Sequence, residues 1–365
     1  MPVASRDAPH PALRPRLLAF PSGSDPHVRE DLARLREHFD VVPFAFGKGG
    51  GLPGLLSNVR RQRRWLEEVG ADADLALAWG ADVHLALPAR WAERRGVPLA
   101  VVLHEADTAC HPALQPGALC SPWRTRVVRY ALQRAALLLP TSEAVLDASN
   151  PWGTEGPSRQ GLRAHLPRLQ TPARVLRPGY DADAWPLGPT ARPRTVCAVA
   201  PFADIRAFRA FGGDTLLGVA RQLPETRIAL IGVEPAFGDA LLDRTHVPGN
   251  VRLVPPLPPE KRSRVLGGAS VIAHLHRVEG PPHALAEAML CGCVPAVSAV
   301  GAAPELAGRI GAIAETPEDA AEAIQRALDL APSQRTRARS RIAEGYGRDQ
   351  RHRDLFAHLD GLLSA

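Results

Sequence analysis

Lysine is almost absent from this 365-residue sequence: Lys48 and Lys261 stand alone, although lysine and arginine together number 44. The remaining 42 basic residues are arginines. An excess of arginine, proline and alanine with so little lysine is typical of a GC-rich coding sequence, and we interpret it first as coding bias and only second as a sign of function. The net charge of +6 still permits an anionic partner, such as a nucleotide, a nucleic acid or a membrane surface.

Long apolar runs are also missing, and cysteines are few. No stretch of 18 apolar residues occurs, so the sequence predicts no transmembrane helix. Residues 1–15 lack an unbroken apolar core of signal-peptide length, which argues against export. The five cysteines are too few and too scattered for a disulfide scaffold, and a reducing compartment fits them best. We therefore expect a cytoplasmic protein.

Three motifs that carry well-known chemistry are absent as well. The sequence has no G-x-x-x-x-G-K-[ST] phosphate loop and no G-x-S-x-G elbow, and residues 21–26 read Pro-Ser-Gly-Ser-Asp-Pro instead of G-x-G-x-x-G. These absences argue against a P-loop nucleotidase, an α/β-hydrolase and an ordinary dinucleotide dehydrogenase. Two D-x-D spacings, at residues 72–74 and 181–183, lie before a strand and in a proline-rich segment. We expect neither to bind a metal ion.

What the sequence does contain is an alternation of short apolar runs with longer segments of helical periodicity. Continuous apolar strands separated by helices predict a parallel sheet covered on both faces. A proline-rich segment at residues 177–194 interrupts the pattern and is interpreted as a linker. The predicted strands lie at residues 17–21, 41–46, 75–79, 99–103 and 136–140 before it, and at residues 195–200, 227–231, 251–254, 271–274 and 296–298 after it.

The pattern therefore predicts an α/β fold with two doubly wound, Rossmann-like domains. Such sheets bind their ligands beyond the carboxyl ends of the strands. With two of them facing each other, the cleft between the domains is the expected functional site.

The most informative segment is residues 271–304, VIAHLHRVEGPPHALAEAMLCGCVPAVSAVGAAP. It predicts a strand, a loop, a helix and a second strand, with Glu279 in the loop and Glu287 about a turn and a half into the helix. Two carboxylates so placed can hold different parts of one ligand, while the helix N-terminus between them offers unpaired N–H groups to an anion. An extended molecule with hydroxyls, a diphosphate and a ribose suits this arrangement.

The E-x7-E spacing is followed by small residues and prolines at set positions, namely Ala288, Met289, Gly292, Pro295, Gly301 and Pro304. This block resembles the retaining glycosyltransferases of the GT-B fold that are usually called family 4 or group 1. Their typical string is close to E-G-F-G-L-x-x-x-E-A-M-A-x-G-x-P-V-V-A-S-x-x-G-G-x-x-E. Further segments resemble the family in the same order, at residues 75–107, 130–148, 175–185 and 250–253.

The resemblance implies an acceptor domain over residues 1–183, a nucleotide-sugar donor domain over residues 184–335, and a C-terminal helix over residues 336–365 that packs toward the first domain. It also implies sugar transfer from a nucleotide donor to an acceptor hydroxyl, with retained configuration and without a protein nucleophile. The nucleotide sugar is then a substrate, and no cofactor or metal ion is implied. Electrostatic stabilisation of the leaving diphosphate would supply most of the catalysis.

The resemblance also implies roles for residues on both sides of the cleft. Glu279 would contact hydroxyls of the donor sugar. His104, in the loop after the strand at residues 99–103, would lie near the donor sugar and the point of transfer. Gly23 and Ser24, in the first strand-to-helix loop, would border the cleft.

Further donor-binding residues follow from the same block. The backbone of Gly280, His283 and Ala284 would face the diphosphate, and Glu287 would hold the ribose hydroxyls. These roles place the diphosphate on the start of the helix, between the two glutamates.

Two departures from the family string concern the diphosphate. The Gly-Arg and Lys expected after the first donor-domain strand are absent from residues 199–209, where we expect Arg206 or Arg209 to contact phosphate instead. Gly-Phe-Gly is replaced by Gly-Pro-Pro at residues 280–282, and prolines supply no N–H group. The alternative to an active enzyme is therefore a catalytically degenerate GT-B scaffold that acts as a binding or partner subunit.

The acceptor would be bound mainly by the first domain, where the resemblance is weakest. Basic clusters at residues 60–64 and 124–134, with Trp65 and Trp123 nearby, are either solvated surface or elements that dock on anionic lipid. They favour a lipid-linked or polysaccharide acceptor and peripheral contact with the inner face of the membrane. No nucleic-acid partner is expected, because aromatic residues do not accompany the arginines near the C-terminus.

Overall fold

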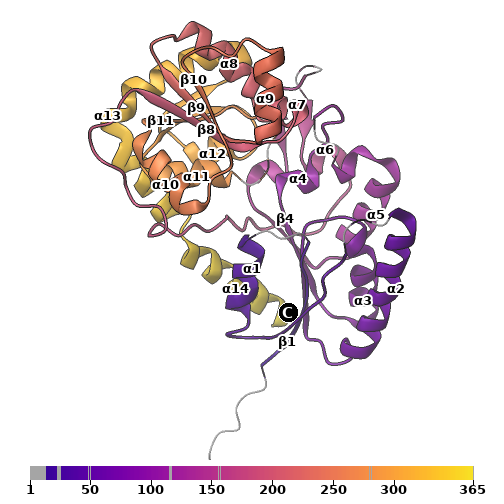
Figure 1. Ribbon diagram of the computed structural model, residues 1–365. Coiled ribbons are helices and arrows are strands. Elements are labelled where there is room, and N and C mark those ends of the chain that lie inside the picture. The colour runs from indigo at the N-terminus through magenta and orange to yellow at the C-terminus, as the bar shows by residue number, and fades with distance from the viewer. Residues whose placement is uncertain are drawn as a thin grey trace, which may run out of the picture.

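The computed structural model describes residues 14–22, 26–47, 49, 51–114, 117–154, 156, 158–278, 280 and 282–364. These residues form two parallel sheets, one from each half of the chain, and helices cover both faces of each sheet (Figure 1). The predicted α/β fold of two Rossmann-like domains is thereby confirmed.

The first sheet has the strand order β2-β1-β3-β4-β5, with every pair parallel. The strands β3 and β4 are buried at every residue, as expected for apolar runs covered on both faces. Helices α1 and α14 pack on one face, and α2, α3 and α5 pack on the other. The elements are β1 (Arg16–Phe20), α1 (Pro26–Leu35), β2 (Asp40–Pro43), α2 (Gly51–Val69), β3 (Leu75–Trp79), η1 (Val83–Leu85), α3 (Ala86–Arg95), β4 (Leu99–Leu103), α4 (Glu105–Thr108), η2 (Ala118–Cys120), α5 (Pro122–Leu132), β5 (Leu137–Pro140) and η3 (Glu143–Val145).

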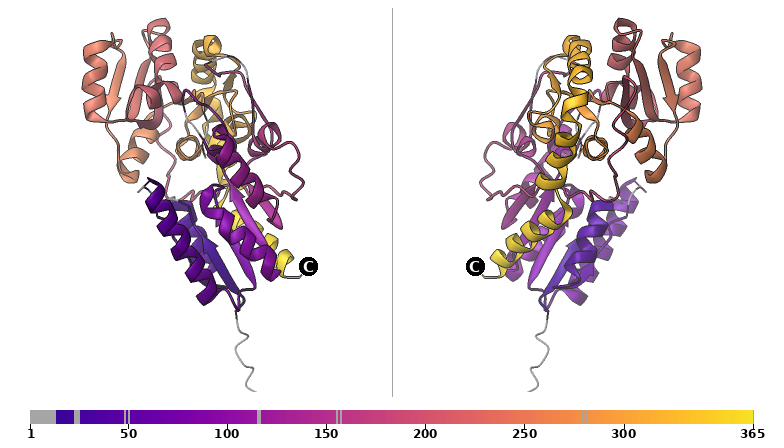
Figure 2. Two further views of the ribbon diagram at one scale, coloured as in Figure 1. Left: turned by 90° about the vertical axis from the view of Figure 1, so that its right-hand side faces the viewer. Right: turned by 90° about the vertical axis from the view of Figure 1, so that its left-hand side faces the viewer.

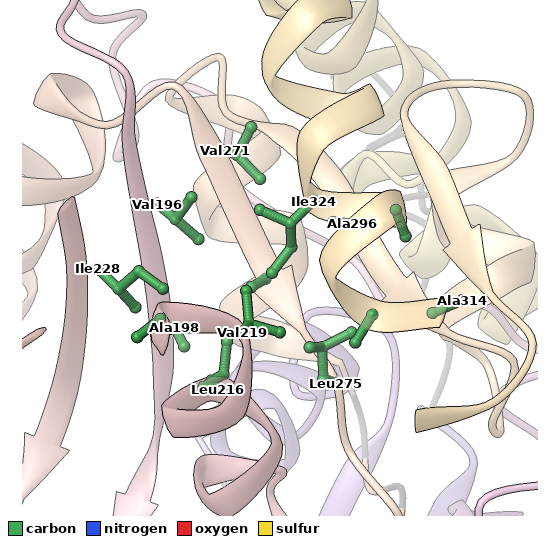
Figure 3. Packing of buried hydrophobic residues seen from close by; sticks show 14 of the residues in the cluster. Val196, Ala198, Leu216, Val219, Ile228, Val271, Leu275, Ala296, Ala314 and Ile324 are labelled. Carbon is green, nitrogen blue, oxygen red and sulfur yellow. The ribbon is translucent and has the colours of Figure 1, made fainter. Parts of the chain in front are cut away.

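The second sheet has the strand order β10-β9-β8-β11-β12-β13, again all parallel. Branched side chains from its strands meet those of α8 and α13 in a tightly packed layer, where Val196, Leu216, Val271 and Ile324 converge (Figure 3). The elements are β8 (Thr195–Phe202), α7 (Ile205–Ala210), α8 (Gly213–Gln222), β9 (Arg227–Val233), α9 (Pro235–Arg244), β10 (Val251–Val254), α10 (Pro259–Gly268), β11 (Val271–His274), α11 (His283–Leu290), β12 (Val294–Ser298), α12 (Ala303–Ala307), β13 (Ala312–Ala314), η4 (Pro317–Asp319), α13 (Ala320–Gly345) and α14 (Arg348–Leu363).

A small antiparallel hairpin joins the halves on one side. It consists of β6 (Ala148–Asn150) and β7 (Ser158–Gln160), is followed by α6 (Leu162–His165), and is not predicted by the sequence pattern. Trp152 in its turn is 1% exposed and belongs to the core of the second sheet. Its indole N–H donates to the carbonyls of Ala314 and Glu315, each at 3.1 Å. The hairpin thus contributes a core side chain to the other half of the molecule.

The C-terminal helices join the halves on the other side. Helix α13 packs along the second sheet and continues unbroken past residue 335, and α14 then returns to the first half (Figure 2). There it contacts α1. The predicted return of the C-terminal helix to the first domain is therefore confirmed. Its anchor is a buried ion pair between Arg351 on α14 and Asp31 on α1, with a shortest distance of 2.7 Å.

The cysteines divide into a bonded pair and three thiols. Cys110 and Cys120 form a disulfide across a short loop of the first half, which the spacing of the cysteines does not predict. Cys197, Cys291 and Cys293 are buried free thiols beneath the second sheet. Within the described residues, no helix is long and apolar enough to cross a membrane.

Candidate functional site

A cavity of about 450 Å³ opens where β8, β9 and β11 end and α11 begins. This is the carboxyl edge of the second sheet, at which doubly wound folds bind ligands. Much of the wall is apolar, with contributions from Val199, Pro201, Phe211, Ile231 and Leu257. The polar and charged side chains that line it are Glu234, Arg262, His274, His276, His283 and Glu287.

The start of α11 forms one wall of this cavity through His283 and Ala284. Pro282 occupies the N-cap position, and among the described residues no side-chain hydrogen bond caps the helix. The first N–H groups of a helix lack partners within it, and their partial positive charge attracts anions. Pro282 supplies no N–H at the N-cap, so the groups that remain are the backbone N–H groups of the first three helical residues, 283–285. The uncapped helix start is therefore chemically suited to a diphosphate.

Glu287 lies on the same helix and also lines the cavity, as the sequence predicts. Its carboxylate contacts Arg262 of α10 at 3.0 Å and is 15% exposed. Burial raises the pKa of Glu287 to about 7, although the charge and hydrogen bond of Arg262 act in the opposite direction. The ionised carboxylate accepts more and stronger hydrogen bonds from hydroxyls than the protonated carboxyl group does.

Two histidines at the end of β11 form part of the cavity wall. His274 and His276 lie with ring centroids 3.7 Å apart, and His276 also contacts the ring of Phe211. Both are buried, and both line the cavity. Flat rings on one wall of a cavity are typical of sites for planar ligands.

His104 lies on the first half of the chain, immediately after β4, and begins the short helix α4. Its backbone N–H donates to Asp107 at 2.9 Å, and its ring nitrogen Nδ1 lies 3.7 Å from the same carboxylate. Burial alone would lower the pKa of His104, but the hydrogen bond and charge of Asp107 outweigh it and raise the pKa. The Asp107 carboxylate thus favours the protonated form of this imidazole, at the carboxyl edge of the first sheet.

The two halves meet at the start of α11. The ring of His27, on α1, stacks on the ring of His283 with centroids 4.2 Å apart. The hydroxyl of Tyr180, from the segment between the halves, lies 3.3 Å from Nδ1 of His283. Sequence reasoning missed His27 and Tyr180, because nothing in their local sequence indicates a contact across more than 100 residues.

Arg206 and Arg209 lie on α7, outside the lining of the cavity. Arg206 donates to the carbonyls of Pro112 and Ala113 in the first half, each at 3.0 Å. Arg209 is exposed, and its carbonyl accepts a bond from Arg277. Their expected contact with phosphate stays a prediction.

Among the other predicted site residues, Gly280 lines the cavity, together with His283, Ala284 and Glu287. Gly23, Ser24 and Glu279 lie outside the described residues. Sequence reasoning also missed Arg262, whose only signal is its position on a helix that precedes the strand β11.

Two family models match the sequence. The glycosyl transferase 4-like domain matches residues 12–160, and the glycosyl transferases group 1 model matches residues 206–344. No curated protein matches the sequence.

Several solved structures share the fold of this chain. A sucrose-phosphate synthase from Thermosynechococcus elongatus superposes with a TM-score of 0.71 at 15% identity, over 96% of this chain and 99% of that one. A UDP-forming trehalose-phosphate synthase from Burkholderia xenovorans gives a TM-score of 0.63 at 11% identity, over 96% and 100% of the two chains. A trehalose-6-phosphate synthase, solved in work on glycosyl transfer with retention, gives 0.63 at 13% identity, over 95% and 99%.

Proposed function

Because this chain belongs to the GT-B glycosyltransferases that combine a glycosyl transferase 4-like domain with a glycosyl transferases group 1 domain, we propose that it transfers a sugar from a nucleotide-sugar donor to an acceptor hydroxyl with retention of anomeric configuration. The observation that supports this most is the uncapped start of α11 beside the buried Glu287. One helix then presents N–H groups to a diphosphate and a carboxylate to a ribose.

The proposed mechanism relies on stabilising the leaving group. As the bond between the sugar and the diphosphate breaks, negative charge develops on the diphosphate, where the helix start opposes it. We further propose that His104, whose pKa is raised by Asp107, lies near the point of transfer and adds positive charge there when it is protonated. Retention agrees with the trehalose-6-phosphate synthase of similar fold, which was solved in work on transfer with retention. We expect no metal ion to be required.

The acceptor is proposed to lie on the first half of the chain, where a second cavity of about 520 Å³ opens beside the end of β3. Hydrogen-bonding side chains line it, including Asn58, Asp82, His84 and Asp107. Such groups suit an acceptor rich in hydroxyls, as expected for the synthesis of a polysaccharide or glycolipid.

A lipid-linked acceptor and peripheral contact with the cytoplasmic face of a membrane form part of the same proposal. Leu52 and Leu56 on α2 are 67% and 49% exposed, and Trp123 at the start of α5 is 53% exposed. Arginines follow these apolar side chains on both helices, which is typical of surfaces that dock on anionic lipid. Trp65 is turned inward instead and packs against Phe20.

The second candidate function is a GT-B scaffold that binds a nucleotide sugar without transferring the sugar. The observation that favours it is the engagement of Arg206 with carbonyls of the opposite half, because this arginine is then not directed at the cavity. Such a protein would bind the donor and leave it unchanged.

A donor and acceptor panel tests the proposal and separates the two candidates. The purified chain is incubated with UDP-, GDP- and ADP-sugars, with and without simple sugars and lipid-linked acceptors. Nucleoside diphosphate release is measured, and mass spectrometry and NMR identify the product. We expect release with one donor, an equal rate in the presence of EDTA, and a product of retained configuration. Donor binding without release supports the scaffold, and an inverted product contradicts retention.

The variant Glu287→Ala tests the assignment of the cavity. We expect its nucleotide affinity to fall at least about tenfold, because the ribose loses its charged acceptor (a hydrogen bond to a charged group contributes about 1.5–3 kcal/mol). The control is Glu322→Ala, which removes an equal charge from an exposed side chain of α13. Equal affinity in both variants would show that the nucleotide binds elsewhere.

A further inference from the structure

Arg262 is built into the cavity wall rather than lying on the surface. It belongs to the first turn of α10, and its side chain is 25% exposed. The guanidinium lies 5.2 Å from the ring centroid of Trp185, a buried residue of the segment that joins the halves. A guanidinium over an indole ring loses conformational freedom, and its remaining N–H groups are held in one plane. The direction in which Arg262 points is therefore fixed.

That direction is toward the carboxylate of Glu287. One terminal nitrogen of Arg262 lies 3.1 Å from Oε1 and 3.0 Å from Oε2. An ionised carboxylate offers about four acceptor positions, so a single bridging nitrogen leaves most of them for a ligand. The contact orients the carboxylate and keeps its capacity to accept further hydrogen bonds.

The contact with Arg262 also affects the charge of the Glu287 carboxylate. Arg262 on α10 contacts Glu287, and Tyr180 from the joining segment and Cys291 at the end of its own helix interact with its charge. The other titratable groups of the described residues that line the same cavity are Glu234, His274, His276 and His283. Arg262 is the cation in contact with the carboxylate. Without it, burial would act alone, and the pKa of Glu287 would rise further above about 7. A protonated carboxyl group has lost acceptor capacity for a ribose diol.

Resting on the proposed function, we propose that Arg262 is a positioning residue for the donor: it holds Glu287 ionised and oriented so that the carboxylate accepts hydrogen bonds from the ribose hydroxyls. It acts through Glu287, and it therefore determines the discrimination between ribonucleotides and deoxyribonucleotides. The resulting affinity for the donor depends on pH through the same carboxylate.

The experiment measures nucleotide binding by calorimetry at several pH values between 6 and 9. UDP, GDP and ADP are titrated into the wild type first, and the one that binds is compared with its 2′-deoxy counterpart. The variants are Arg262→Gln, the charge-preserving Arg262→Lys, and the control Arg264→Gln, which removes an exposed charge from the same helix. Near-UV circular dichroism establishes that each variant is folded.

For Arg262→Gln we expect the affinity for the ribonucleotide at pH 7 to fall at least about fivefold, because the loss of an adjacent opposite charge shifts a pKa by about one to three pH units. The midpoint of the pH profile should move upward, and the preference for the ribonucleotide over its deoxy counterpart should shrink. Arg262→Lys should keep much of the wild-type pH midpoint and ribose preference, and Arg264→Gln should match the wild type.

Two results would overturn the inference. If Arg262→Gln lost affinity equally for both nucleotides with an unchanged pH midpoint, the arginine would contact another part of the nucleotide or only support the fold. If it bound like the wild type, it would have no role in the donor site. A wild type that bound no nucleotide would instead contradict the proposed function. Should Arg262→Gln not fold, the pH midpoint and ribose preference of Arg262→Lys decide the outcome, since retained charge with altered geometry must change at least one of them.

Discussion

Two buried carboxylates in this molecule, Asp31 and Glu287, are each paired with one arginine, yet their environments differ. Asp31 lies between α1 and α14 and is 1% exposed. It accepts bonds from two nitrogens of Arg351, at 3.0 and 2.7 Å, and from the indole N–H of Trp79 at 3.0 Å. Glu287 lines an open cavity and is held by a single nitrogen of Arg262.

The pKa values of the two groups reflect this difference. Burial raises the pKa of both, but for Asp31 the charge and hydrogen bonds of Arg351, together with the bond from Trp79, outweigh burial and lower it. For Glu287 burial prevails, and the pKa rises to about 7. A saturated carboxylate stabilises a fold, whereas an unsaturated one keeps acceptor positions for a ligand at a cost in stability.

The largest expected effect is that of Asp31→Ala. The substitution leaves Arg351 buried without its carboxylate partner, so we expect a loss of about 3–5 kcal/mol in the free energy of unfolding. Urea unfolding at pH 7 measures it, with Glu37→Ala as a control that breaks an exposed ion pair with Arg34 and should cost less than about 1 kcal/mol. Equal losses of unfolding free energy in Asp31→Ala and Glu37→Ala would show that the buried ion pair of Asp31 stabilises the fold no more than an exposed one does.

A smaller loss is expected for Trp79→Phe, which removes one of the three bonds to Asp31 and leaves the ion pair. The cost should be about 1–3 kcal/mol, since a buried charged acceptor loses a donor. The lowered pKa of Asp31 contributes stability that is present above the pKa of the unfolded state and lost as the pH falls through the folded one. Trp79→Phe removes one of the causes that lower the pKa of Asp31, so this pKa should be higher in the variant than in the wild type. Acid unfolding of the variant should therefore begin at a higher pH. An unchanged acid midpoint would show that the indole N–H does not stabilise the ionised carboxylate.

The last prediction concerns Glu287→Gln, whose effect on stability depends on pH. A raised folded pKa means that the wild type loses stability as the pH rises from the unfolded value of 4.5 to about 7. The variant has no carboxylate at this position and lacks this loss. The melting temperature of the variant minus that of the wild type should therefore increase from pH 5 to pH 8. The full difference is at most about 3 kcal/mol. A constant difference across this range would contradict the elevated pKa.

Much of the fold could be predicted from the sequence, because strands such as β3 and β4 are continuous apolar runs and α11 follows a strand at the expected spacing. Glu287, His283 and Ala284 could be placed at the site for the same reason: their positions relative to one strand and one helix are local. Arg262, Tyr180 and Asp31 could not, since their roles come from partners on other elements. The hairpin at β6 and β7 was missed because its strands have only three residues each and no apolar alternation.

Trp152 has a consequence for the way in which the two halves depend on each other. By sequence its indole belongs to the first half, yet it is part of the core of the second. Loss of order in the hairpin would leave an indole-sized void beneath β13 and expose a large apolar ring in the first half. The two sheets should therefore unfold as one cooperative unit rather than as independent domains.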